Sequence, residues 1–229
     1  MTRERPILFS GEMVRAILGG RKTQTRRVIT VPWRKGKRCH IEEDGELLAM
    51  DEYGDCHPMV EQCPYGKPGD LLWVREAWFA ELSLDAIRPS LLPHDERDGA
   101  LCPCWFAADH SETPRVHDGL RAGRLRPSIH MPRWASRITL EVTEVRVQRV
   151  QEISEEDAAA EGAAHRIAPG GDLAGAFEGI DAPIGYRAHF RDLWDRINGR
   201  RTGCAWADNP WVWAVSFRVV SISGREVKP

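Results

Sequence analysis

A short run of the sequence at positions 20–27 reads Gly-Arg-Lys-Thr-Gln-Thr-Arg-Arg and brings reactive residue types together. A threonine hydroxyl such as that of Thr25 becomes a nucleophile when a nearby base takes its proton. Lys22 can act as that base when burial or neighbouring positive charge lowers its pKa toward neutrality. Such charge is available from three arginines in the same run: Arg21, Arg26 and Arg27. The residue types therefore favour proton transfer and nucleophilic attack at this run.

The pairing of Lys22 with Thr25 makes a demand on the backbone. Residues three positions apart face opposite sides of a strand and the same side of a helical turn. Gly19 and Gly20 precede the pair and permit a turn, because glycine tolerates backbone angles that other residues avoid. We therefore expect the segment after Gly20 to turn. The alternative is that a turn rich in Lys, Arg and Thr merely ends a helix and faces water.

The spacing of apolar residues predicts the elements that position this run. A strand at 7–9 leads to Ser10, which is a suitable N-cap for a helix that ends at Gly19. Farther along, the turn at 67–70 leads into a strand at 71–76. A long strand or hairpin at 137–150, in which the alternation changes phase between Val142 and Val145, predicts a bulge or bend. Three more elements follow: a helix opened by Ser154 that ends near Glu161, a helix at 186–198 and a strand at 211–219.

Three irregular stretches separate these elements, at about 31–62, 81–131 and 163–183. Loops of that length are uncommon unless they are functional or disordered. We therefore expect an α+β protein with a single domain over residues 1–222, in which a small β-barrel with flanking helices carries these stretches as insertions. Residues 223–229 are expected to form a tail.

Composition and charge bound the classes of function. The 229 residues are 42% hydrophobic and 29% charged, as in an ordinary globular protein, and the formal net charge is −2. No apolar run approaches the roughly 20 residues of a membrane helix, and the N-terminal apolar run is too brief for a signal peptide. We therefore expect a cytoplasmic protein with no membrane partner.

Positive charge is nevertheless concentrated. Residues 13–40 contain nine Lys or Arg and no Asp or Glu, and a second basic stretch extends to Arg137. This segregation fits a local basic patch, and a solvated face explains it equally well.

Several motifs in the same order resemble the ASCH domain of the PUA-like superfamily. They are the Gly-x-Lys-Thr-x-Thr-x-Arg run after a short helix, the Pro68-Gly69-Asp70 turn before a strand, and an acidic helix after the next strand. Within that family the chain is similar to bacterial N4-acetylcytidine amidohydrolases. It is closer still to larger phage-borne ASCH proteins, which carry segments like 63–70 and 209–213. The resemblance covers about half of the chain, and the insertions lie outside it.

The resemblance implies a catalytic set. The amidohydrolases use a lysine and a threonine of this run with a glutamate on the later helix, and the matching residues here are Lys22, Thr25 and Glu161. We therefore expect amide hydrolysis on a cytidine-type nucleoside, with Thr25 as nucleophile, Lys22 as base and Glu161 as the acid/base partner. No cofactor is required for this chemistry. Further residues are candidates for substrate binding: Arg21, Arg26, Arg27, Trp73, Arg75 and Glu76.

A second hypothesis is a binding module or ribonuclease. The basic run could contact phosphates while tryptophans such as Trp33, Trp73 or Trp78 stack on the bases of single-stranded RNA. The expected partner is then a modified nucleoside under the first hypothesis and single-stranded RNA under the second.

The six cysteines allow a structural metal site. Cys56, Cys63, Cys102 and Cys104 together would make a tetrathiolate zinc site that ties two insertions together. The pattern lacks paired Cys-x-x-Cys knuckles, and scattered thiols explain six cysteines almost as well.

Overall fold

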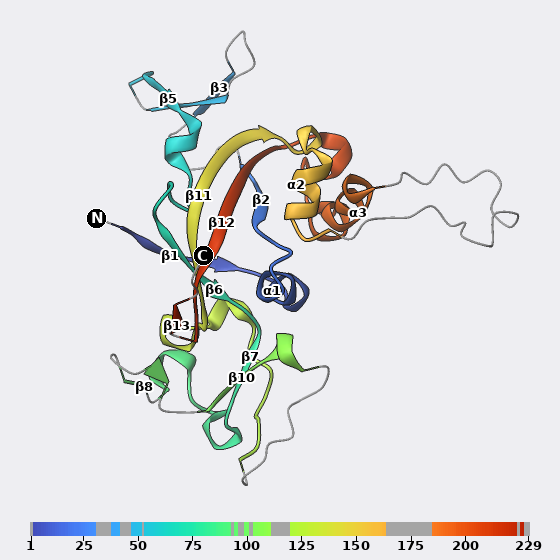
Figure 1. Cartoon of the computed structure of the whole chain (residues 1–229). Coiled ribbons are helices and arrows are strands. Elements are labelled where there is room, and N and C mark those ends of the chain that lie inside the picture. Colours follow the sequence, from blue (N-terminus) through green and yellow to red (C-terminus); the bar gives the residue numbers. More distant parts are fainter. Residues whose placement is uncertain are drawn as a thin grey trace, which may run out of the picture. The chain divides into compact units, whose positions relative to one another are not determined.

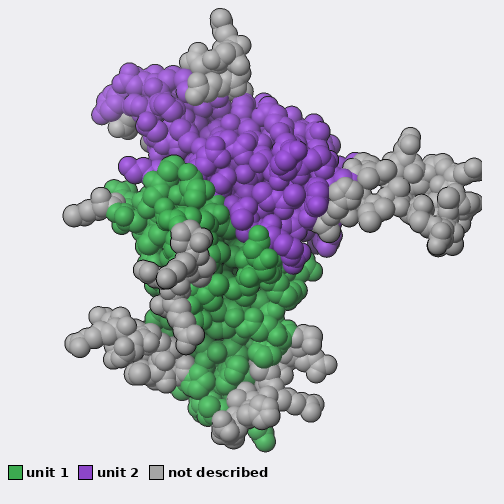
Figure 2. All heavy atoms as spheres, in the orientation of Figure 1, with its two compact units in different colours: residues 1–20, 68–143, 217–229 green, residues 21–67, 144–216 purple. Residues whose placement is uncertain are grey.

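The computed structural model describes most of the chain, namely residues 2–30, 38–41, 47–51, 53–92, 94–95, 99–100, 103–110, 120–163, 185–223 and 225–226. Two compact units form, shown in different colours in Figure 2. Unit 1 comprises residues 1–20, 68–143 and 217–229, and unit 2 comprises residues 21–67 and 144–216. The stretch expected as an insertion at 81–131 thus belongs wholly to unit 1, whereas 31–62 and 163–183 belong to unit 2.

Unit 1 is built on strands and one longer helix (Figure 1). Its elements are β1 (Glu4–Leu8), α1 (Gly11–Leu18), β6 (Leu71–Arg75), β7 (Trp78–Ala80), β8 (His94–Asp95), β9 (Gly99–Ala100), β10 (Cys104–Phe106), the first half of β11 (Ile138–Arg149), the last half of β12 (Trp211–Ile222) and β13 (Arg225–Glu226). β6 pairs in parallel with β1 and antiparallel with β11. The side chain of Ser10 accepts a hydrogen bond from the Met13 amide, which confirms the predicted N-cap of α1.

Unit 2 contains β2 (Gln24–Val28), β3 (Arg38–Ile41), β4 (Leu47–Met50), β5 (Cys56–Pro58), α2 (Glu155–Ala160) and α3 (Tyr186–Asn198), with the remaining halves of β11 and β12. β2 runs antiparallel to β12, so that Thr25 lies opposite Val215 and Arg27 lies opposite Trp213. The two helices pack against each other, as Figure 1 shows. β3, β4 and β5 form a small antiparallel sheet inside the stretch that sequence patterns left irregular.

The main sheet has the strand order β1-β6-β11-β12-β13, with β2 beside β12. Among the described residues these pairings do not return to β1, so the sheet is open and the fold is α+β. β11 is one continuous strand in which buried positions alternate up to Val142 and resume at Val145. The two exposed residues between them mark the predicted change of phase.

Each unit has its own apolar core. In unit 2, side chains from α2 and α3 close over Val212 of β12, and the core includes Val150, Ile153, Ala158, Phe190 and Trp194. In unit 1 a second cluster surrounds Trp78 and includes Ala80, Leu92, Met131 and Ala135. Within the described residues, no helix is both long enough and apolar enough to cross a membrane.

α3 is fastened to α2 at its first turn. Gly185 precedes α3 with φ 107°, which favours glycine, and a Cβ there would lie 2.7 Å from the Glu155 carboxylate. Glu155 Oε2 accepts hydrogen bonds from the amides of Tyr186 and Arg187 at 2.7 and 3.2 Å. A carboxylate at this position satisfies free amides at a helix N-terminus. The contact fixes α2, the helix that leads to Glu161.

Candidate active site

The side chain of Lys22 lies buried in unit 2 against the end of α2. Its Nζ donates to Glu161 Oε2 at 2.7 Å, to the Glu161 carbonyl at 2.8 Å and to the Gln24 carbonyl at 2.8 Å. A backbone bridge between Lys22 and Glu161 reinforces the contact. Exposed fractions of 1% for Lys22 and 5% for the Glu161 side chain make this a buried ion pair. The structure thus brings together two of the three predicted catalytic residues.

Burial sets the proton affinity of the lysine. It lowers the pKa of Lys22 below its ordinary value of 10.5, and the positive charges of Arg27 and Arg26 act in the same direction. Glu161 opposes this shift by attracting the ammonium and accepting its hydrogen bond. The net direction is the one that a lysine general base requires.

Arg26 links the lysine–glutamate pair to a second carboxylate. Its guanidinium donates to Glu161 Oε1 at 3.3 Å and to Asp157 Oδ2 at 2.7 Å, and it also contacts the Gln24 side-chain oxygen. The same guanidinium lies over the Phe190 ring at 5.8 Å. Arg26 is therefore a buried bridge between the carboxylates of Asp157, on α2, and Glu161, at the C-cap of α2. Arg26 is 5% exposed, and its role in substrate binding stays a prediction.

Asp157 accepts hydrogen bonds from several side chains around the Lys22–Glu161 pair. It accepts from Gln24 Nε2 at 3.2 Å and from Arg146 at 3.0 and 3.1 Å. Burial alone would raise the pKa of Asp157, but Arg26 and Arg146 outweigh it and hold that pKa below its usual value. Gln24 Nε2 also donates to Ser216 Oγ on β12 at 3.1 Å. Gln24 of β2 is therefore hydrogen-bonded to both α2 and β12.

Thr25 is placed differently. The chain turns at Gly20, where φ is 69°. It does not continue to turn, because Lys22 forms a β-bridge with Glu161 and the chain enters β2 at Gln24. Since side chains alternate along a strand, Thr25 lies on the face of β2 opposite Gln24 and Arg26, which contact α2. Its side chain is buried. The expected turn is therefore corrected: pairing with β12 keeps this segment extended.

The other residues predicted for substrate binding fall into two groups. Arg21 is exposed, and Arg27 is half-buried. Burial raises the pKa of Tyr65, and the charge of Arg27 opposes part of that rise. Trp73, Arg75 and Glu76 belong to unit 1. Their roles in binding stay predictions.

Each member of this second group already has a partner within unit 1. Arg75 lies over the Trp73 ring at 4.6 Å and donates to the Ile129 carbonyl at 3.3 Å. Glu76 is 1% exposed and accepts from Arg137 at 2.8 and 3.0 Å. Burial raises the pKa of Glu76, although Arg137 opposes the rise. This Glu76–Arg137 pair was not anticipated from the sequence, because its residues are 61 positions apart.

The predicted zinc ligands are not seen as a group. Cys56 is exposed, Cys63 is buried and Cys104 is half-buried, while Cys102 lies outside the described residues. Among the residues that are described, no three His, Cys, Asp or Glu side chains gather in a way that would hold a metal ion.

Comparisons with known proteins found a likeness only at the level of solved structures. No family model matches the chain, and no curated protein does. Among solved structures, the chain is similar to protein EF3133 from Enterococcus faecalis V583, whose family is given as DUF984. The two are 10% identical, the match covers 100% of this chain and 87% of that chain, and the TM-score is 0.39. A likeness of this degree carries no conclusion about function.

Proposed function

We propose that this chain is an ASCH-type protein with a PUA-like fold and that it removes an acyl group from a modified nucleobase such as N4-acylcytidine. The observation that carries the proposal is the buried pair of Lys22 and Glu161, with Nζ and Oε2 2.7 Å apart. Buried ion pairs stabilise proteins little, if at all, compared with apolar side chains of similar size. A lysine whose pKa is lowered beside a carboxylate is instead suited to proton transfer.

The proposed reaction uses each residue for one task. Lys22 first passes one proton to Glu161, and Thr25 Oγ then attacks the acyl carbonyl carbon while its proton passes to the neutral amine of Lys22. This step requires a rearrangement on substrate binding, because Thr25 lies on the other face of β2 and Lys22 Nζ donates three hydrogen bonds in the structure. The bond between carbonyl carbon and exocyclic nitrogen then breaks, and the departing amine takes a proton relayed from Lys22 through Glu161. Water finally cleaves the threonine ester, which releases the acid and restores the hydroxyl.

Arg26 and Asp157 act as positioning residues in this scheme. Arg26 holds Glu161 from the side opposite Lys22, and Asp157 holds Arg26. Asp157 lies on α2 and Glu161 is the C-cap of that helix, so the arrangement keeps Glu161 oriented while protons move. Support from neighbouring residues that do not themselves react keeps the reacting groups correctly positioned.

The role of Thr25 is the part that the strand geometry challenges most, so the test is directed there. Wild-type protein, Thr25→Ser and Thr25→Val are incubated with N4-acetylcytidine, quenched in acid and analysed by peptide mass spectrometry. The expected result is an acetyl adduct on the peptide containing residue 25 in wild type and Thr25→Ser, and neither adduct nor turnover in Thr25→Val. Full turnover by Thr25→Val would assign the nucleophile to water instead. Absence of turnover in all three, with each protein folded, would remove the amidohydrolase proposal.

A further inference from the structure

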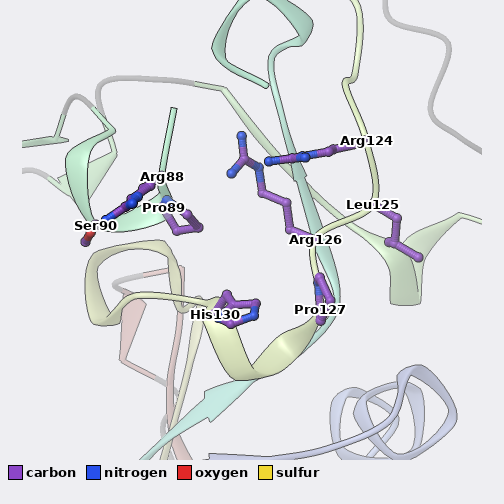
Figure 3. Close-up of a pocket in the computed structure, with 8 residues that line it drawn as sticks. All are labelled: Arg88, Pro89, Ser90, Arg124, Leu125, Arg126, Pro127 and His130. Carbon is purple, nitrogen blue, oxygen red and sulfur yellow. The ribbon is translucent and has the colours of Figure 1, made fainter. Parts of the chain in front are cut away.

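A separate pocket opens in unit 1, within the stretch expected from sequence to be an irregular insertion. It has a volume of about 600 Å³ and is lined by residues 88–90, residues 124–127 and His130. Pockets for small ligands commonly have volumes of roughly 300 to 1,000 Å³. Figure 3 shows Arg88, Pro89 and Ser90 on one side and Arg124 with Leu125 on the other. The pocket is thus large enough for one nucleotide unit.

The walls of this pocket are held by a buried arginine. Arg126 is 3% exposed and donates to the carbonyls of Ile87 at 3.1 Å and Leu84 at 2.9 Å. Its guanidinium also lies over the Trp78 ring at 5.5 Å. Arg126 therefore joins the chain before Arg88 to the chain around residue 126 and fixes the width between the two walls.

The carboxylate of Asp85 is engaged with the backbone. Both oxygens of Asp85 accept from the amide of Arg124, at 3.0 and 2.9 Å, and Asp85 lies 3.8 Å from Arg126. Among the described residues that line the pocket, none is acidic. The Asp85 contact sets the backbone position of Arg124 while its side chain extends into the pocket region (Figure 3). The wall is built before any ligand arrives, which reduces the entropy lost on binding.

The rim carries two exposed cations. The side chains of Arg88 and Arg124 are exposed, and among the described residues neither guanidinium has an ion-pair or hydrogen-bond partner. Guanidinium groups bind phosphate through two parallel hydrogen bonds and stack on planar rings. His130 at the pocket adds a further planar ring.

Apolar surface lies beside these cations. Pro89, Leu125 and Pro127 line the pocket, and Leu125 is 55% exposed. Two residues next to lining residues in the sequence, Leu91 and Ile129, are 70% and 57% exposed. Free phosphate would make no contact with this apolar surface, whereas the sugar and base of a nucleotide would cover it. The combination fits single-stranded nucleic acid, in which splayed bases stack on arginine, histidine and apolar groups.

We propose that this pocket binds one phosphorylated nucleotide unit of a single-stranded nucleic acid, with Arg88 and Arg124 on phosphate and Leu125 against the base or sugar. The proposal does not depend on amide hydrolysis at Lys22. It can hold if the chain has no hydrolase activity, and it can fail while that activity is present.

The test measures binding of a fluorescent oligouridine of about ten nucleotides, a length within the site sizes of single-strand binders, to the full chain. The variant Arg88→Ala/Arg124→Ala is compared with Arg200→Ala/Arg201→Ala, which removes the same charge from exposed positions in unit 2. Loss of two charge-assisted contacts is expected to weaken binding by roughly tenfold or more. The slope of log K against log salt should fall by about 0.7, the contribution of one neutralised phosphate in a single strand. The control variant should stay within about twofold of wild type, because exposed charges away from the contact have small effects.

Further arms separate the source of the signal. Uridine 5′-monophosphate should compete with the oligonucleotide better than uridine does, and Arg88→Lys/Arg124→Lys should bind with intermediate affinity because lysine keeps charge but loses the planar fork. Equal loss in the pocket and control variants, or equal competition by polyglutamate, would reduce the effect to general charge and overturn the proposal. Unchanged affinity of the pocket variant would also overturn it.

Discussion

Lys22 and Glu161 are 139 positions apart, yet the lysine ammonium contacts both the side chain and the backbone carbonyl of the glutamate. The pair is therefore a tertiary feature that forms only when β2 and α2 are packed together. Its three hydrogen bonds and its burial tie unit 2 together at the place where chemistry is proposed.

Breaking the pair from either side should be costly. Removing one partner of a buried ion pair typically destabilises a protein by about 3–5 kcal/mol. Glu161→Gln should cost more than Lys22→Met, because Glu161 keeps Arg26 as a partner when the lysine is lost. Unfolding in urea measures both, and the double variant should be more stable than the sum of the single effects predicts. Arg191→Ala, which breaks an exposed pair with Asp192, is the control and should change stability by under about 1 kcal/mol.

The pH dependence of turnover should report Lys22. Burial lowers the pKa of Lys22, so activity should rise with pH along a limb centred below 10.5, as the amine loses its proton. Arg27 contributes to that lowering, so Arg27→Ala should raise the pKa and move the limb to higher pH. A profile that does not move in Arg27→Ala would assign the limb to another group.

Asp157 should make stability sensitive to acid. Since Arg26 and Arg146 hold its folded-state pKa below the unfolded value, the unfolded chain binds more protons as pH falls. The stabilisation is present above the unfolded pKa and is lost as pH drops through the folded pKa. Asp157→Asn should lower stability at neutral pH and flatten the dependence below about pH 4. Glu61→Gln, at an exposed position, is the control and should show the same dependence of stability on pH as wild type.

The pocket wall in unit 1 should not tolerate a larger residue at Gly123. A Cβ at this position would clash with the carboxylate of Asp85, which accepts hydrogen bonds from the Arg124 amide. Gly123→Ala should displace Asp85, release the Arg124 amide and weaken oligouridine binding even though no ligand-contacting side chain is changed. Gly54→Ala is a control for backbone strain, because Gly54 has a positive φ but open space around its Cβ position. Equal effects on binding in both variants would mean that the Asp85 contact does not shape the pocket.

Local signals predicted the helices well. Ser10 and Ser154 both accept the N-cap hydrogen bond expected of them, and α3 occupies the predicted residues 186–198. These features depend on neighbours in sequence, which patterns report directly. Ile197 near the end of α3 is 50% exposed, because the apolar face of the helix is buried only as far as Trp194.

Features set by distant partners were not accessible in this way. The extension of the chain at Thr25 depends on pairing with Val215, and the burial of Arg26 depends on two carboxylates of α2. The strands at 38–41 and 47–50 pair with each other across residues that carry no strong alternation. Long-range hydrogen bonding overrode local preference at each of these places.

The measurement closest to the central claim is release of acetate from N4-acetylcytidine by the purified full chain. Wild type should release acetate and cytidine in equal amounts. Lys22→Met and Glu161→Gln should each lose at least about a hundredfold in kcat/KM, the usual contribution of a positioned acid or base, while Arg191→Ala keeps wild-type turnover. Equal release by wild type and by folded Lys22→Met and Glu161→Gln proteins, or none by wild type, would contradict the assignment of Lys22 and Glu161 to catalysis.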